Sequence, residues 1–358
     1  MRFDYATRYR DSFALLRHRD ERLLYGLLMA VLAALPWLLS PFFLGELSYV
    51  FILCIASLGL MLLTGYTGQV SLGHAAFVAI GAYAQAWLLS KGVPLPLSLT
   101  LAALISAAAG LLIGVPAIRV SGLYLAMVTM AFAIIVEQVI GHWSSVTGGF
   151  TGLAVEEPSI AGFSLGGPRA FYYLCLALLT LVLLGLLNLL RSGLGRALVG
   201  VRDSEAAAYS LGIHVQGVKT VAFGLSAGVT GLAGALLAHH LKYLTPDGFT
   251  LILSLELVLM VVIGGLGSLR GALLGAALIS LLPTAISRLK PWLPDSLAKQ
   301  FGLEIFIFGL VLAIFVLFEP GGLNARWLKL RALIESFPLY RRDTFKRNKR
   351  YMKSERYK

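Results

Sequence analysis

The sequence predicts an all-α fold, a polytopic bundle of about eight to ten transmembrane helices with cytoplasmic N- and C-termini. Of the 358 residues, 58% are hydrophobic and only 13% are charged, about half the share in an ordinary soluble domain. So few charges could not cover a soluble surface, and so hydrophobic a chain is not disordered. The 38 glycines fit a membrane bundle, because glycine lets transmembrane backbones approach each other closely.

Ten apolar runs are candidate spans, because a spanning helix needs about twenty mostly apolar residues. In chain order they are 23–40, 46–64, 70–89, 95–115, 120–140, 170–190, 219–240, 251–264, 271–287 and 302–319. Two depart from the simple pattern: the run 70–89 is studded with Gly, Ser, His and Gln, and the run 251–264 is short and glycine-bounded. Either could be broken or re-entrant, which is tolerated where the segment is buried in protein or lines a cavity.

The basic residues predict the orientation. With both ends inside, the inner segments hold 24 Lys and Arg and the outer segments hold six, as the positive-inside rule requires. We expect a basic cytoplasmic segment at 1–22, a transmembrane domain at 23–320 and a basic cytoplasmic tail at 321–358. The basic ends favour contact with anionic membrane lipid. They do not favour nucleic acid, for which no folded basic domain is long enough.

Two of the loops between the predicted spans are long. The extracytoplasmic loop 141–169 is glycine-rich and carries Trp143, Phe150, Glu156 and Glu157; it could be a docking surface or a lid. The cytoplasmic loop 191–218 is the most distinctive polar stretch of the chain.

A short helix of about two turns is predicted within the cytoplasmic loop. Asp203 or Ser204 can cap its start, Glu205 suits the positive end of the helix dipole, and Gly212 can end it in a left-handed conformation. Three alanines, strong helix formers, lie between them. Such a helix could insert into a partner's groove, or it could be a solvated connection.

Several motifs give the chain a family resemblance. Glu205-Ala206-Ala207 followed by Gly212 resembles the EAA loop of ABC-importer permeases, although Thr220 to Phe223 lack the Ile and Leu-Pro of the full pattern. Further segments look like signatures of branched-chain amino acid permeases of the LivM type. They are Gly65 to Phe77, Gly122 to Thr129, Thr147 to Gly149, Gly264 to Ser268 and the stretch around Arg196, Arg202 to Ala207 and Gly212-Ile213. The resemblance covers about residues 45–322.

This resemblance implies a function and a set of partners. The chain would be the permease subunit of an importer that moves branched-chain amino acids inward across the cytoplasmic membrane of a bacterium or archaeon. The expected partners are a second homologous permease, two cytosolic ATPases and an extracytoplasmic solute-binding protein. The sequence contains no phosphate loop, so ATP and Mg would be bound by the ATPases, and this chain would hold no cofactor or metal and have no catalytic residues.

The coupling helix implied by the family would place six residues in contact with, or next to, the ATPase. They are Arg202, Asp203, Glu205, Ala206, Ala207 and Gly212.

Polar and ionisable residues at membrane depth are candidates for the translocation pathway. They are Gln69, Ser71, His74, Glu137, Gln138 and Glu256. For His74 a structural hydrogen bond is the favoured alternative, for Glu256 it is an equal one, and Glu137 could instead extend to the membrane surface. The neighbours His239 and His240 cannot face one metal from a helix, and we expect them at the outer interface. Cys54 and Cys175 are expected as buried small hydrophobes.

Three other functions compete with this interpretation. A urea or short-amide permease shares much of the motif pattern. A secondary transporter or channel would have similar spans but need no ATPase and no coupling helix. An intramembrane enzyme is disfavoured, because the sequence has no G-x-S-x-G, H-E-x-x-H or C-x-x-C motif.

Overall fold

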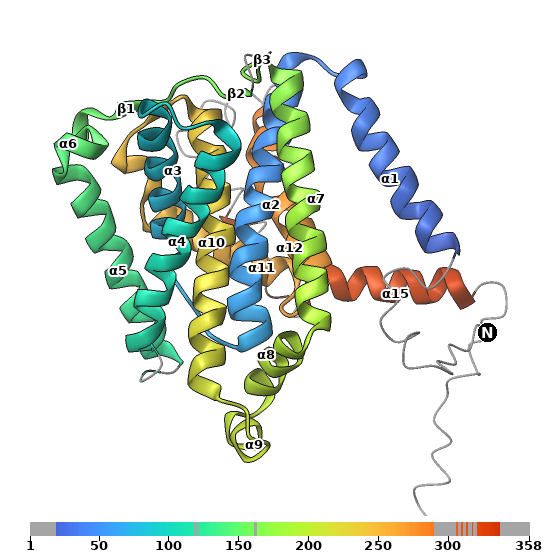
Figure 1. Cartoon of the computed structure of the whole chain (residues 1–358). Helices are drawn as coiled ribbons and strands as arrows, with labels where there is room; N and C mark the ends of the chain where they lie inside the picture. Colours follow the sequence, from blue (N-terminus) through green and yellow to red (C-terminus); the bar gives the residue numbers. More distant parts are fainter. Residues whose placement is uncertain are drawn as a thin grey trace, which may run out of the picture.

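The computed structural model describes residues 19–117, 122–160, 163–289 and 321–336, with single residues at 120, 306, 309, 310, 313 and 317. Within them the chain is a helical bundle (Figure 1). The long helices are α1 (Arg19–Leu38), α2 (Pro41–Thr67), α3 (His74–Ser90), α4 (Leu95–Ala117), α5 (Leu123–His142), α7 (Pro168–Arg191), α10 (Val215–Leu241), α11 (Leu251–Gly264), α12 (Leu269–Leu289) and α15 (Gly322–Ser336). The short helices are α6 (Ser144–Thr147), η2 (Gly149–Thr151), α8 (Gly193–Asp203), α9 (Glu205–Ser210) and η3 (Pro246–Phe249).

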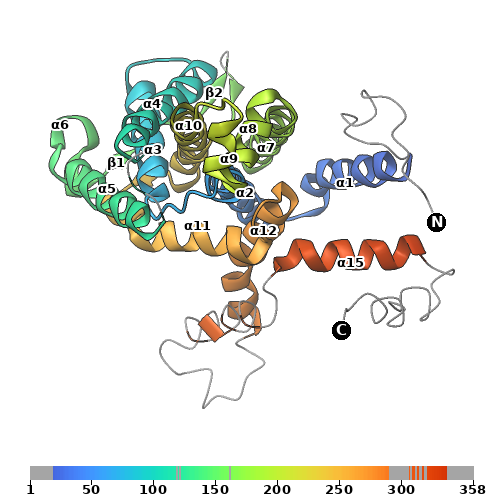
Figure 2. The ribbon, with the colours of Figure 1, turned by 90° about the horizontal axis from the view of Figure 1, so that it is seen from below.

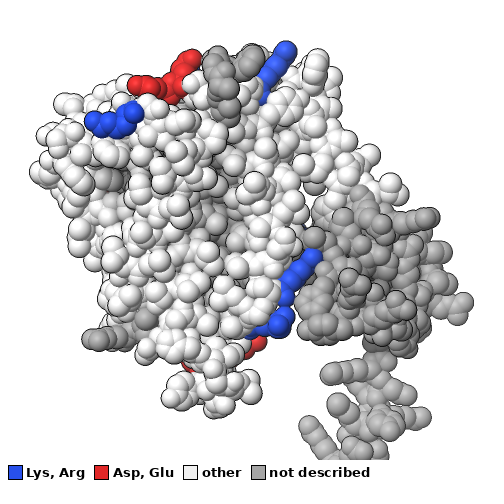
Figure 3. Space-filling view, viewed as in Figure 1, with Lys and Arg blue, Asp and Glu red and all other residues white. Residues whose placement is uncertain are grey.

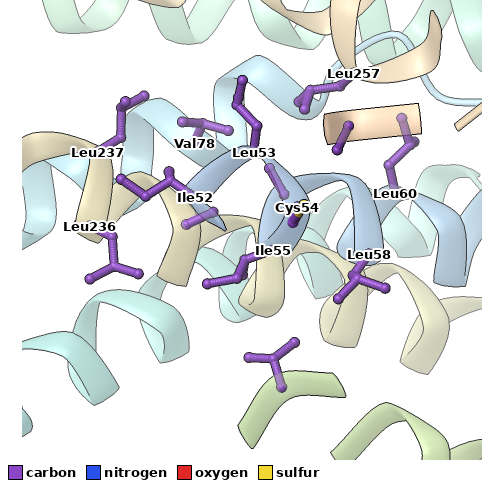
Figure 4. Packing of buried hydrophobic residues seen from close by; sticks show 14 of the residues in the cluster. Ile52, Leu53, Cys54, Ile55, Leu58, Leu60, Val78, Leu236, Leu237 and Leu257 are labelled. Carbon is purple, nitrogen blue, oxygen red and sulfur yellow. The ribbon is translucent and has the colours of Figure 1, made fainter. Parts of the chain in front are cut away.

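Helix α10 lies at the centre of the bundle and packs against α2, α3 and α4. The core between these helices is aliphatic (Figure 4), with Ile52 and Ile55 of α2, Val78 of α3 and Leu236 and Leu237 of α10 among its buried side chains. Both α2 and α10 are mostly buried within the chain, whereas α4, α5 and α7 each expose an apolar side. This arrangement suits a bundle whose outer helices face lipid or another subunit.

Glycines bring the central backbones into direct contact. A β-carbon on Gly81 of α3 would overlap the carbonyl of Gly231 in α10, and one on Gly234 of α10 would overlap that of Val78 in α3. On the α2 side, a β-carbon on Gly59 would lie 2.9 Å from the carbonyl oxygen of Ser226. The high glycine content therefore serves close helix packing, as the sequence predicted.

Seven described helical segments are long and apolar enough to cross a membrane, and they match seven of the ten predicted spans. Figure 3 shows an uncharged band around the visible described surface, with charged side chains near its two ends. The run 23–40 forms α1, which has a shorter apolar stretch and leans away from the bundle in Figures 1 and 2. The run 302–319 lies largely outside the described residues, as do the chain termini.

The run 70–89 is helical only from His74, so residues 70–73 form a break, as the sequence allowed. A second break follows α11, where Gly265 and Gly267 have φ of 108° and 80°. Helix α15 starts beside this second break and runs across the direction of α2 and α7 (Figure 1).

The two predicted loops lie at opposite ends of the bundle (Figure 1). We call these two ends of the bundle the α9 end and the β1 end. At the β1 end, β1 (Leu153–Ala154) pairs antiparallel with β4 (Tyr243–Leu244), and β2 (Ser159–Ile160) pairs with β3 (Phe163–Ser164). The β1–β4 pairing fastens the predicted extracytoplasmic loop to the end of α10.

Candidate functional site

Helix α9 is the short helix predicted in the cytoplasmic loop. The hydroxyl of Ser204, rather than the side chain of Asp203, caps it by accepting a hydrogen bond from the Ala207 N–H at 3.2 Å. Gly212 follows with φ of 80°, the left-handed conformation expected at a helix end. The helix spans six residues, somewhat less than the two turns predicted. Helix α8 before it was not predicted, because its glycines disfavour a helix.

An ion pair joins α9 to α10. The Nζ atom of Lys219 lies 2.6 Å from Oε1 of Glu205, and the Lys219 side chain is only 6% exposed. A nearly buried ammonium is costly unless an opposite charge compensates it. Glu205 therefore has a structural role in addition to its place at the helix start, and no local pattern predicts this partner fourteen residues away.

Arg202 links the segment before α9 to the end of α2 and to the break between α11 and α12. Its Nη1 donates to the carbonyl oxygen of Gly65 at 3.0 Å, and its Nε and Nη2 donate to Oδ1 of Asp203 at 3.0 and 2.9 Å. A β-carbon on Gly267 would lie 3.1 Å from Nη1, and one on Gly68 would lie 3.2 Å from Cγ of Arg202. The guanidinium thus sits where the end of α2 meets the turn between α11 and α12.

The surface of α9 is exposed and partly apolar. Tyr209 and Leu211 are 77% and 82% exposed, and Ala206 and Ala207 are exposed beside them. An open groove of about 610 Å³ lies between α9 and the first turn of α10. Its lining residues are Glu205, Ala206, Tyr209, His214, Val215, Gln216 and Lys219. Large apolar side chains this exposed at the tip of a protein suit contact with another protein.

His74 is the centre of a buried hydrogen-bond network. Its Nδ1 lies 2.9 Å from the Ser71 hydroxyl and its Nε2 lies 2.8 Å from that of Ser226. Ser226 in turn donates to the Gly59 carbonyl at 2.6 Å. The network joins the break before α3 to α10 and α2, and His74 is fully buried. This geometry supports a structural role for His74 and Ser71, the alternative favoured from the sequence for His74, and their place in a pathway stays a prediction.

The other pathway candidates do not join this network. Gln69 is buried with its Oε1 unpartnered among the described residues. Glu137 and Glu256 are half-buried and Gln138 is exposed. Within the part of the chain that the structure describes, neither glutamate side chain makes a hydrogen bond or an ion pair. Their place in a pathway stays a prediction.

We expect His74→Phe to lower the stability of the purified chain and to leave transport by each folded molecule intact. Ser71 and Ser226 would then be buried without their shared partner, so the free energy of unfolding should fall by about 1–3 kcal/mol. The measurement is the unfolding temperature in detergent. His142→Phe, a matched change at an exposed histidine, should change neither quantity. Lost uptake at unchanged stability would instead make His74 a pathway residue.

His239 and His240 lie in the last turn of α10, at the β1 end, and their place at the outer interface of the membrane stays a prediction. His239 is 5% exposed, and its Nε2 lies 3.1 Å from Nε2 of Gln85, which donates to Ser98 at 2.9 Å. The small residues of α10 admit neighbouring helices on several sides, so its last turn is buried too. His240 is half-buried, with its ring stacked on Tyr49 at 5.5 Å. Cys54 and Cys175 are buried free thiols, as predicted.

Comparisons with known proteins place the chain in a family. Residues 42–317 match the family described as the permease component of branched-chain amino acid transport systems. The LivM permease of the high-affinity branched-chain amino acid transport system of Salmonella typhimurium is 34% identical over 72% of this chain and 67% of its own, and that of Escherichia coli is 33% identical over the same shares. A probable LivH permease of Methanocaldococcus jannaschii is 27% identical over 82% of this chain and 95% of its own.

No solved structure gives a significant match. The profile match covers most of the chain and includes the breaks, the His74 network, α9 and the groove beside it. The chain belongs to the permease family of branched-chain amino acid transport systems and is a multi-pass cytoplasmic-membrane subunit of an ABC importer.

Proposed function

We propose that this subunit carries branched-chain amino acids inward, paired with a second homologous permease and driven by two cytosolic ATPases that bind ATP and Mg. An extracytoplasmic binding protein would deliver the substrate to the β1 end. The exposed apolar surface of α9 and its groove carry the proposal, because they suit docking of an ATPase. The substrate class rests on the names of the curated relatives.

The α9 end is assigned to the cytoplasm on charge. Counting the whole sequence, the orientation with α9 inside places 24 of the 30 Lys and Arg on the cytoplasmic side, in line with the positive-inside rule. The same orientation puts the loop fastened by β1 and β4 outside.

Two contacts would carry motion from α9 into the spans. The Glu205–Lys219 pair attaches α9 to α10. Arg202, in the segment just before α9, is bonded to the end of α2. Because ATP closure moves the docked ATPases as rigid bodies, these short charged contacts would make the last turn of α2 and the first turns of α10 follow α9. The chain itself would contribute no catalytic group.

The test is purification of the tagged complex in mild detergent, followed by uptake into vesicles. The proposal expects an ATPase and a second permease to co-purify, and expects labelled leucine to be taken up when ATP is supplied. Uptake that survives ATP depletion and collapses with the membrane potential would identify a secondary transporter instead. Uptake of urea in place of leucine would overturn the substrate class and retain the importer.

A further inference from the structure

A small pocket lies at the β1 end, on the side of the chain opposite α9. It has a volume of about 210 Å³ and lies between the first turns of α2 and α7, the last turn of α10 and the loop after β1. Drug-sized ligands occupy pockets of about 300 Å³ or more. The pocket therefore suits a ligand of amino-acid size better than a peptide or a larger solute.

The pocket combines an apolar wall with charges of both signs. Pro41, Pro168 and Phe171 supply the apolar wall. At the mouth, Nζ of Lys242 lies 3.9 Å from Oε1 of Glu157, the outer limit of an ion pair. Both side chains are about two-thirds exposed, so their mutual attraction is weak. Each charge is thus available to a ligand that brings the opposite one.

His239 is part of the pocket lining. Its Nε2 faces Gln85, and the backbone carbonyl of Glu156 lies near the imidazole. The residue is only 5% exposed, so it forms part of the closed inner wall of the pocket.

The backbone conformation of Lys242 positions this residue at the same pocket. Lys242 has φ of 62°, and of the described residues it is the one non-glycine with positive φ. A left-handed lysine costs roughly 1–2 kcal/mol, and glycine or asparagine would adopt this conformation more easily. Lys242 is the left-handed cap of α10, and its N–H bonds to the Ala238 carbonyl. Its own carbonyl oxygen accepts a hydrogen bond from the Val155 N–H at 2.9 Å. These two bonds hold the backbone of Lys242 at the edge of the pocket.

We propose that this pocket binds one zwitterionic amino acid with an apolar side chain. Glu157 takes the ligand's ammonium group, Lys242 takes its carboxylate, and the side chain lies against Phe171 and Pro168. The inference rests on the proposed function for the choice of a branched aliphatic amino acid. It goes further in giving the permease a substrate site of its own, at the face where a binding protein would release its ligand.

The test is equilibrium binding of labelled leucine to the purified transporter complex in lipid nanodiscs, without binding protein. We expect saturable binding to the unaltered complex, with an affinity for leucine that falls at least tenfold in Glu157→Gln and in Lys242→Asn. Asparagine tolerates the left-handed backbone, so this variant removes the charge without adding strain. Lys91→Asn is the matched control. It removes a different lysine, whose ammonium group lies over the ring of Trp87 in α3, and this variant should bind leucine as the unaltered complex does.

Two leucine analogues sharpen the assignment. Isoamylamine lacks the carboxylate and isocaproate lacks the ammonium group, so each should compete more weakly than leucine against the unaltered complex. Lys242→Asn should erase the preference of leucine over isoamylamine, and Glu157→Gln should erase its preference over isocaproate. Equal loss of both preferences in both variants, with a lowered unfolding temperature, would indicate a disrupted loop and overturn the assignment.

The uptake assay tests the proposed function, and the binding assay tests the pocket. ATP-driven leucine uptake without binding sensitive to these two variants would overturn the pocket and leave the proposed function standing. Variant-sensitive leucine binding without ATP-driven leucine uptake would overturn the proposed function and leave the pocket standing.

Discussion

Replacing Ala207 with tryptophan abolishes ATP-driven uptake, on our expectation, while the chain still inserts into the membrane and assembles with its partners. Ala207 is exposed on α9, so the bulky ring disturbs no packing within the chain and instead spoils the close fit of α9 that would transmit the motion of the bound ATPase. Uptake of labelled leucine should fall at least tenfold, to background. Ala207→Ser, which keeps the side chain small, should retain uptake.

Glu205→Lys should have the same outcome by another route. It places a second positive charge against the nearly buried ammonium of Lys219, which detaches α9 from α10. Glu205→Gln keeps the shape and removes the repulsion, so it should retain part of the uptake. Co-purification of the ATPase reports assembly in each variant. Normal uptake by both Ala207→Trp and Glu205→Lys would remove α9 from the coupling role.

The second large effect is expected at the glycines of the central helices. Gly81→Ala and Gly234→Ala each insert a methyl group into a neighbouring backbone carbonyl. Because backbone cannot move aside as a side chain can, each change should cost at least the usual 1–3 kcal/mol of overpacking. The measurements are the yield of folded protein and its unfolding temperature in detergent.

Gly185→Ala is the matched control for these two changes. Gly185 lies within α7, and a β-carbon placed there would meet nothing within 4 Å. Alanine should be neutral or slightly stabilising at this position, since it favours the helix. If Gly185→Ala were as harmful as Gly234→Ala, close packing would not explain the losses.

Local rules predicted the parts of this molecule that depend on neighbouring residues. Span positions followed from length and hydropathy, α9 followed from its cap and its terminal glycine, and the break before α3 followed from the Gly-Ser-His composition. Contacts between distant segments were beyond such rules. The partner of Glu205 is on another helix, and Arg202 reaches Gly65, 137 residues away. The burial of His239 was equally out of reach, because hydropathy shows that a helix crosses the membrane but not how many neighbours surround its end.

The backbone contacts around α10 have a consequence for where a solute can pass. Since α10 touches α2 and α3 backbone to backbone, and α4 packs along it as well, a leucine molecule cannot pass between α10 and these helices where Gly59, Gly81 and Gly234 lie. Opening a channel there would mean separating helices whose backbones are in contact. A conduit built by this protein would therefore run along the outer surface of the bundle, and its opposite wall would have to come from a second subunit.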